Sequence, residues 1–244
     1  MEKSKLFGLT ALCCLVLAAS CNKPSEQCCG LVRLNLDHDS ALREATKSAV
    51  SDYTTLPSAA DFSLSITDAQ DNQTPVSDPT QAVELAAGNY TASASFGSTS
   101  DEGWDKPCFE GTQAFTVQGG ETTDVTITVK LANCIVRVET TEQFRNYYSD
   151  WTFSVKSGAG TTVDFVRDET RAAFFDAYQI SVSGTLTGQN GKDYTFSSKE
   201  YKNLEAATCY TLKFDVSNVG GNSIVITFND IVDDVELGSI DINE

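Results

Sequence analysis

Very few residues of this chain could carry out acid–base or nucleophilic chemistry. The only histidine, His38, lies in the segment Asp37-His38-Asp39-Ser40, which contains all three residue types of a Ser-His-Asp triad. Neighbours in sequence cannot readily adopt the triad geometry, and no G-x-S-x-G pattern accompanies them. We therefore predict that this segment is a solvated turn after the first strand and that the protein is not an enzyme.

The cysteines offer no better catalytic or metal site. Cys28 and Cys29 have no positioned base that would activate a thiol, and no CxxC or histidine-containing set has the spacing of a zinc site. Cys134 and Cys209 lie in strand-like runs, where cysteine behaves as a small buried hydrophobe. Together with Cys28, Cys29 and Cys108 they make five thiols after Cys21. Five is odd, so at least one thiol is free or pairs between chains. The sequence assigns no disulfide.

An acidic cluster near the C-terminus is the remaining candidate for metal chemistry. It contains Asp230, Asp233, Asp234 and Glu236, whose carboxylates could bridge a calcium ion. Their spacing is not that of an EF-hand, and no glycine lies at the required turn. We interpret the cluster as a solvated acidic segment, with calcium as the alternative, and we expect no metal or cofactor.

The clearest chemical signal is for lipid attachment at Cys21. Lys3 and Lys5 precede an apolar run over residues 6–19, which is too short to span a bilayer comfortably. The run ends in Leu17-Ala18-Ala19-Ser20-Cys21, which resembles the lipobox of bacterial lipoproteins. We therefore predict a signal peptide over residues 1–20, acylation of Cys21 and a polar tether over residues 21–29. The expected location is the outer membrane, on a face that the sequence leaves open.

Charge and length limit the partners and the architecture. The chain has 244 residues, with 34 acidic against 17 basic side chains and a formal net charge of −17. A nucleic acid needs several closely placed basic contacts, so we exclude it as a partner. The length suits two domains of about 100 residues each.

The hydrophobic pattern predicts strands almost throughout. In the segment of residues 31–36, Val32, Leu34 and Leu36 alternate with Leu31, Arg33 and Asn35, which is the period of a half-buried strand. Similar runs cover residues 62–66, 90–94, 115–117 and 125–129. Residues 40–50 are expected to form a loop with a helical turn. Many short strands at this spacing predict an all-β sandwich.

The chain also repeats itself, which predicts two tandem domains. Residues 61–66 match residues 150–155 type for type, and the opening run of residues 31–34 matches residues 135–138. A period near 90 to 100 residues is too long for a solenoid. We predict an N-terminal domain over residues 30–131 and a C-terminal domain over 132–244. Because almost no linker joins them, we expect a defined orientation between the two.

The aromatic residues suggest packing more than ligand binding. Trp151 stands where the first repeat has Phe62, so we predict that it is a core residue, and we expect Tyr90 and Tyr178 to pack as well. Trp104 differs because it lies in a polar loop, where it either folds back as a lid or stacks on a sugar or partner. With Phe109 it would form a glycan-binding platform, which is the alternative function.

An ordered series of motifs resembles one known family. The series comprises the lipobox, a Gly-Leu-Val-Arg-Leu first strand and the segments of residues 85–90, 115–123, 131–133 and 168–172. Together these look like a domain-of-unknown-function family of lipoproteins from anaerobic Gram-negative bacteria, similar in architecture to fimbrillins. The resemblance implies two transthyretin-like Greek-key β-sandwich domains on a lipid anchor.

The resemblance also implies a way of acting. In pilus-forming fimbrillins a protease trims the first strand after Arg or Lys, and a strand of the next subunit fills the groove. Arg33 and Arg43 are the conceivable trimming sites, and residues 235–242 alternate like a donor strand. Alternatively, Arg33 only faces solvent and the tail frays or caps its own sheet. We expect a structural or adhesive, fimbrillin-like cell-envelope protein that contacts a protein partner by strand addition.

Overall fold

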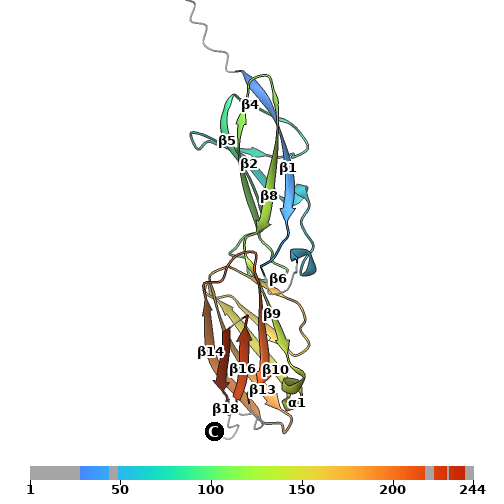
Figure 1. The fold of residues 1–244 in the computed structure, drawn as a ribbon, viewed down its shortest axis with the longest axis vertical. Helices are drawn as coiled ribbons and strands as arrows, with labels where there is room; N and C mark the ends of the chain where they lie inside the picture. The colour runs from blue at the N-terminus through green and yellow to red at the C-terminus, as the bar shows by residue number, and fades with distance from the viewer. Residues whose placement is uncertain (1–27, 44–48, 218–222, 230, 240–244) are drawn as a thin grey trace, which may run out of the picture.

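The computed structural model describes residues 28–43, 49–217, 223–229 and 231–239, and β-strands dominate them (Figure 1). Buried and exposed residues alternate along most strands, as in β1 (Cys29–Asp39), where Val32 and Leu34 are buried and Arg33 is exposed. This two-residue period places one face of each strand against a core. The predicted all-β sandwich fold is confirmed.

The N-terminal half forms one seven-stranded sheet in the order β3-β2-β5-β7-β8-β1-β4. β7 and β8 pair only at Phe109–Glu110 with Lys130–Leu131, so the sheet splits into two layers joined at one end. The two layers enclose the N-terminal core, which includes Ile66, Ile127 and Val32. Besides β1, the strands are β2 (Ser63–Asp68), β3 (Gln73–Val76), β4 (Val83–Ala86), β5 (Gly88–Phe96), β7 (Phe109–Val117) and β8 (Thr122–Leu131).

The C-terminal half contains two facing sheets. The five-stranded sheet has the order β11-β10-β13-β14-β18, and the six-stranded sheet has the order β17-β16-β15-β9-β12-β6. The strands of the first are β10 (Tyr148–Ser157), β11 (Thr162–Val166), β13 (Gln179–Gly188), β14 (Asp193–Lys202) and β18 (Gly238–Ser239). The strands of the second are β6 (Gly103–Trp104), β9 (Cys134–Thr140), β12 (Ala173–Phe175), β15 (Cys209–Val216), β16 (Ser223–Phe228) and β17 (Ile231–Glu236).

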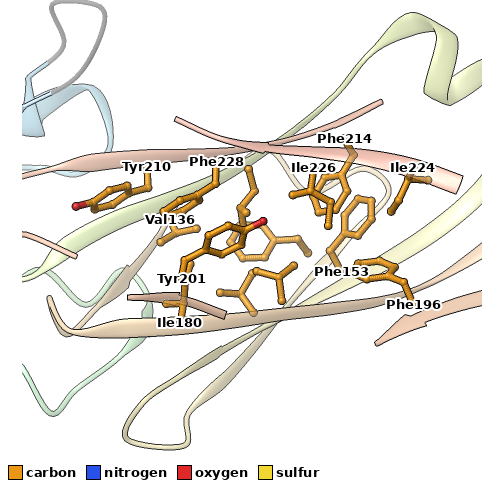
Figure 2. Packing of buried hydrophobic residues seen from close by; sticks show 14 of the residues in the cluster. Val136, Phe153, Ile180, Phe196, Tyr201, Tyr210, Phe214, Ile224, Ile226 and Phe228 are labelled. Carbon is orange, nitrogen blue, oxygen red and sulfur yellow. The ribbon is translucent and has the colours of Figure 1, made fainter. Parts of the chain in front are cut away.

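The C-terminal core lies between these two sheets and is rich in aromatic rings (Figure 2). Phe153 of β10 stacks on Phe214 of β15 with 3.6 Å between ring centroids, which joins the two sheets directly. Tyr201 stacks on Phe228 at 4.2 Å. Trp151 is 6% exposed within the same cluster, so its predicted place in the core is confirmed.

The described chain has little helix. The helix α1 (Glu142–Tyr147) begins after Thr141, whose hydroxyl accepts a hydrogen bond from the Phe144 amide, and it buries Phe144. The two 3-10 turns are η1 (Val50–Asp52) and η2 (Ala59–Asp61). The first lies at the end of the segment where a helical turn was expected, although residues 44–48 of that segment are outside the described residues.

Hydrogen bonds fix the short connection between the two halves. β8 ends at Leu131 and β9 begins at Cys134, and Asn133 between them is fully buried. Its side-chain amide donates to the Lys106 carbonyl at 2.8 Å, and its side-chain oxygen accepts from the Cys108 amide at 3.3 Å. A buried amide side chain with its partners satisfied restricts rotation of the connection.

Candidate interaction site at the sheet edges

β1 has two unequal neighbours. On one side it pairs in parallel with β8 from Leu31 to Asp39. On the other side it pairs with β4 only up to Val32. The Leu31 amide donates to the Glu121 carbonyl, so odd-numbered residues point their backbone groups toward β8. Even-numbered residues of β1 beyond Val32 therefore present N–H and C=O groups at an edge that no described strand covers.

Close packing positions the start of β1. Gly30 is buried, and a Cβ atom at this position would lie 2.4 Å from the Gln118 carbonyl oxygen and 2.8 Å from a methyl carbon of Val117. Only glycine lets the backbone of β1 approach the β7–β8 hairpin this closely.

β9 repeats the arrangement of β1 in the C-terminal half. It pairs in parallel with β15 over its length, whereas its antiparallel pairing with β12 stops at Val136. The Ile135 amide donates to the Thr208 carbonyl, so even-numbered residues such as Val138 point their backbone groups to the other, uncovered side. The two halves thus leave the same strand partly open.

The two predicted trimming sites differ in their surroundings. Arg33 is an exposed strand residue within β1, as the solvent-facing alternative predicts. The Arg43 side chain is 73% exposed and forms an ion pair with Glu205. The Arg43 amide donates to the Ala207 carbonyl at 2.9 Å, and its carbonyl accepts from the Cys209 amide. Arg43 is therefore held against the C-terminal half.

The prediction of a solvated turn at His38 is wrong. His38 lies inside β1, and its ring contacts Phe62 and Phe109 edge-on at 5.7 and 5.9 Å between centroids. The strand continues because β8 pairs with it through Asp39. Among the described residues, the buried Nδ1 atom of His38 has no hydrogen-bond partner.

Trp104 packs against the C-terminal core, although it lies in the N-terminal half of the sequence. It lies in β6, which pairs with β12 as an edge strand of the six-stranded sheet. Its ring contacts Phe165 at 4.8 Å between centroids, and the Arg171 guanidinium lies over the ring at 4.6 Å. Aromatic and cation–π contacts of this kind stabilise a half-buried ring. The lid alternative describes Trp104 better than the sugar-stacking one.

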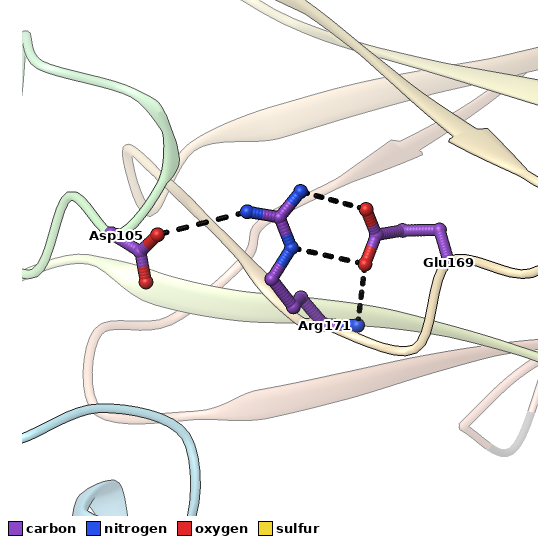
Figure 3. A network of polar contacts seen from close by, with 3 residues as sticks. All are labelled: Asp105, Glu169 and Arg171. Carbon is purple, nitrogen blue, oxygen red and sulfur yellow. Dashed lines mark hydrogen bonds and ion pairs between the residues drawn. The ribbon is translucent and has the colours of Figure 1, made fainter.

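Arg171 connects this ring to two carboxylates (Figure 3). Its guanidinium forms a two-point contact with Glu169, with N···O distances of 2.8 and 3.1 Å, and reaches Asp105 at 3.7 Å. The Arg171 side chain, which donates hydrogen bonds to the carboxylate, lowers the pKa of Glu169 to about 2. A second link joins the halves nearby, because Glu102 accepts hydrogen bonds from the Ser157 hydroxyl and the Asp176 amide.

The structure does not support Phe109 as a ligand-binding residue. It is fully buried in the N-terminal core, where it contacts Phe96 and Phe62. Phe109 is the first residue of β7 and pairs with Leu131 of β8, where the two layers of the sheet meet. Its ring therefore points into the core. Tyr178 is a second correction, because it is 65% exposed and was expected to pack. Tyr90 does pack, since its ring stacks on Phe115 at 5.7 Å.

The buried cysteines agree with the sequence interpretation. Cys134 and Cys209 are 0% and 2% exposed, which confirms them as core residues. Burial raises the pKa of Cys134 to about 12 and that of Cys108 to about 11. Such thiols are protonated at neutral pH and therefore unreactive. Cys28 is exposed, and Cys21 lies outside the described residues.

The acidic cluster does not converge on a cation in the described residues. Asp233 and Asp234 are adjacent in β17, so their side chains point to opposite faces of the strand. Asp233 accepts a hydrogen bond from the Tyr201 hydroxyl at 3.1 Å, and Asp234 accepts one from the Ser217 hydroxyl at 2.6 Å. Asp230 lies outside the described residues. Within residues 28–43, 49–217, 223–229 and 231–239, no group of acidic, cysteine or histidine side chains could hold a metal.

The tail covers its own sheets as far as it is described. β17 pairs with β16, and β18 pairs with β14 of the other sheet, so the chain crosses from one layer to the other. This agrees with the alternative in which the tail caps its own sheet. Residues 240–242 of the predicted donor segment lie outside the described residues. No helix in the described part of the chain is long and apolar enough to cross a membrane.

The described residues form an all-β protein of sandwich-like sheets. Two of its strands, β1 and β9, each keep a partly uncovered edge. The chain belongs to the family described as Domain of unknown function (DUF4493), whose model matches residues 29–243. The resemblance to a family of unknown function is thereby confirmed. A comparison with curated proteins finds no match.

Solved structures from Bacteroides and Parabacteroides are among those that resemble the chain. A candidate adhesin from Bacteroides thetaiotaomicron is 12% identical, with coverage of 88% of this chain and 100% of its own and a TM-score of 0.45. A fimbrial assembly protein from Parabacteroides distasonis is 10% identical, with coverage of 87% and 98% and a TM-score of 0.41. Likeness at this level carries no residue from those proteins to this one.

Proposed function

We propose that this protein is a lipid-anchored component of the cell envelope with a structural or adhesive role, and that it acts by pairing strands at its sheet edges. Cys21 would carry the lipid, and the described body would present the edges. The observation that carries the proposal is the uncovered edge of β1 beyond Val32. An edge with free backbone donors and acceptors is a template for a strand of another chain.

Replacement of β1 would expose a deeper acceptor site. Val32 and Leu34 are 0% and 7% exposed and face the N-terminal core, so loss of β1 would leave an apolar groove beside β8. Burying about 100 Å² of apolar surface stabilises a complex by about 2.5 kcal/mol before the costs of association. A foreign strand with apolar side chains at alternate positions would fill the groove.

A cut after Arg43 would convert an anchored form, which keeps β1, into a trimmed form that can accept a new strand. Cys21 precedes β1, so a cut after Arg43 separates the lipid-bearing segment from the body once β1 leaves. A cut at Arg33 would require β1 to leave β8 first, because the residue lies within the paired strand. Arg43 is also paired, but only through one isolated bridge with Thr208, so fewer hydrogen bonds must open there than at Arg33. We therefore assign trimming to Arg43, with the anchored form keeping β1 and the trimmed form accepting a new strand.

Arginine-specific proteolysis of the full chain in detergent tests this proposal. Intact mass and size-exclusion chromatography with light scattering are measured before and after digestion. We expect one cut after Arg43, followed by multimers or a complex with a partner subunit. Arg43→Gln should prevent the cut, and Arg33→Gln should not. A chain that stays an intact monomer under all conditions would overturn pilus-type assembly.

A further inference from the structure

A small cleft lies at the end of the C-terminal half that is remote from Asn133. β9 begins beside Asn133 and leads to α1, and the cleft forms where the end of α1 meets the turn between β13 and β14 (Figure 1). Its volume is about 260 Å³, close to the lower limit of about 300 Å³ for small-molecule sites. Three tyrosines, three amide side chains and one glycine line it, so the lining is uncharged in a chain of net charge −17.

Two tyrosines of the lining are fixed by their neighbours. Tyr148 is 2% exposed, so its ring belongs to the core. The Tyr194 ring is nearly perpendicular to it, at 6.2 Å between centroids and 81°, and the Lys192 ammonium lies over the Tyr194 ring at 5.6 Å. The Gln189 amide donates to the Tyr147 carbonyl at 3.0 Å, which joins the turn to the end of α1. The two sides of the cleft are therefore held together.

The third tyrosine, Tyr147, differs because no other side chain engages its ring. It is the last residue of α1 and is half-buried against the C-terminal core. Among the residues that the structure describes, its ring has no aromatic or cationic partner and its hydroxyl forms no hydrogen bond. The face of an aromatic ring carries partial negative charge, which attracts the C–H groups of a sugar ring. Tyr147 is thus the ring of the cleft that suits stacking.

Two amide side chains of the turn are each oriented by one hydrogen bond. Gln189 donates from Nε2 to the Arg145 carbonyl at 3.4 Å, which leaves its Oε1 as an acceptor. Asn190 accepts at Oδ1 from the Lys192 amide at 3.0 Å, which leaves its Nδ2 as a donor. A sugar hydroxyl both donates and accepts hydrogen bonds, so an acceptor and a donor on adjacent residues suit a pair of hydroxyl groups.

Gly188 keeps the space between these groups open. It is buried and pairs with Tyr148 across the sheet. A Cβ atom at this position would lie 2.8 Å from Oδ1 of Asn190 and 3.2 Å from a ring carbon of Tyr194. Any side chain would therefore displace an amide and a ring that line the cleft, and glycine avoids this.

The lining fits a neutral sugar better than a peptide strand or an anion. A strand would need unpaired backbone groups, but Tyr148 and Gly188 already pair with each other. An anion would need a cation in the lining, whereas the nearby Lys192 ammonium lies over Tyr194. The net charge of −17 also repels polyanions. Aromatic and amide groups without charge remain, and these match a neutral sugar ring and its hydroxyl groups.

We propose that this cleft binds one sugar unit of a neutral glycan, with the sugar ring stacked on Tyr147 and its hydroxyl groups hydrogen-bonded to Gln189 and Asn190. The site goes beyond strand pairing, because it involves neither β1 nor a cut at Arg43. Failure of strand pairing would leave the glycan site untouched, and failure of glycan binding would leave strand pairing untouched. The competing role of Tyr147 is only to cover the core at the end of α1.

Affinity electrophoresis of the full chain in native gels tests this proposal. Each gel contains one soluble polysaccharide: dextran, mannan, arabinogalactan or xylan as a neutral probe, or polygalacturonate as an acidic one. We expect at least one neutral polysaccharide to retard the protein, with an affinity that falls about tenfold or more in Tyr147→Ala. Tyr178→Ala is the matched control, because that tyrosine is exposed and lies just before the other end of β13, and it should keep full binding.

A second variant separates ligand contact from folding. Gln189 and Asn190 are both exposed, so Gln189→Ala/Asn190→Ala should still melt cooperatively and should weaken binding by about tenfold. Retardation by polygalacturonate alone, or by none of the polysaccharides, would overturn the proposal. So would equal retardation of the natural chain and either variant. Loss of stability in Tyr147→Ala without retardation of the natural chain would show that Tyr147 only covers the core.

Discussion

The guanidinium of Arg171 lies over the indole of Trp104, with 4.6 Å between the guanidinium carbon and the ring centroid. The two residues come from different halves of the chain, and Trp104 also pairs through its backbone with Ala173 of β12. Through these contacts β6, which comes from the N-terminal half of the sequence, forms the edge of the six-stranded sheet.

Trp104→Ala should destabilise the protein. The substitution removes the contact with Phe165 and the cation–π contact with Arg171, so we expect a loss of about 2–3 kcal/mol in the free energy of unfolding. Urea denaturation measures this loss. Tyr178→Ala is the matched control, because that ring is 65% exposed, and it should change stability by less than about 0.5 kcal/mol. Equal effects of the two substitutions would contradict the assigned role of Trp104.

The Glu169–Arg171 pair should make stability depend on acid pH. The pKa of Glu169 is lowered from 4.5 to about 2 in the folded protein, so its contribution to stability is complete above about pH 5. It is lost as the pH falls through 4.5 toward 2, because the unfolded state takes up the proton first. Urea midpoints of the natural chain and Glu169→Gln should differ above pH 5 and converge near pH 2. A constant difference over that range would show that Glu169 titrates normally.

Thiol labelling should distinguish the exposed Cys28 from the buried Cys108 and Cys134. At pH 7.5 a maleimide reagent should modify Cys28 quickly and leave Cys108 and Cys134 unmodified, since both are buried and protonated. Mass spectrometry of digested peptides locates the label. Cys108 and Cys134 should both react once the chain is unfolded in guanidinium. Fast labelling of Cys134 in the native protein would contradict the packing described here.

Gly30→Ala should loosen β1 without touching its buried side chains. The added methyl group would meet the Gln118 carbonyl oxygen at 2.4 Å, so the start of the strand must shift, at a cost of about 1–3 kcal/mol. Amide hydrogen exchange should accelerate across Leu31–Leu36. Gly88→Ala provides a control, because its methyl group would find its nearest atom at an ordinary 3.6 Å. Exchange rates that match between the two variants would show that β1 tolerates the displacement.

Local periodicity predicted what depends on neighbouring residues. The alternation of Val32 and Leu34 with Arg33 appears directly as buried and exposed positions in β1. The similarity of residues 31–34 to residues 135–138 anticipated that β1 and β9 occupy equivalent places beside parallel partners. Each of these features is contained within one strand, so a single segment of sequence carries it.

Features that depend on distant segments were beyond the same reasoning. His38 follows a polar residue and resembles a turn, but pairing with Val129 of β8 keeps it in a strand. Phe109 looks like a loop aromatic until the meeting of β7 and β8 turns it inward. Trp104 acquires its role only because Arg171, far along the chain, lies over it. The edge of β9 is open because β12 is short and its pairing ends at Val136. No residue pattern in the sequence predicts that length.

Strand replacement in the trimmed protein tests the central claim most directly. The folded chain is cut after Arg43, the released segment is removed in mild denaturant, and the remaining body is mixed with a synthetic peptide of residues 29–39. Native mass spectrometry should show one peptide bound to each body, and a peptide that carries Leu34→Asp should fail to bind because it places a charge against the N-terminal core. A folded body that binds neither peptide, or both equally well, would contradict the account.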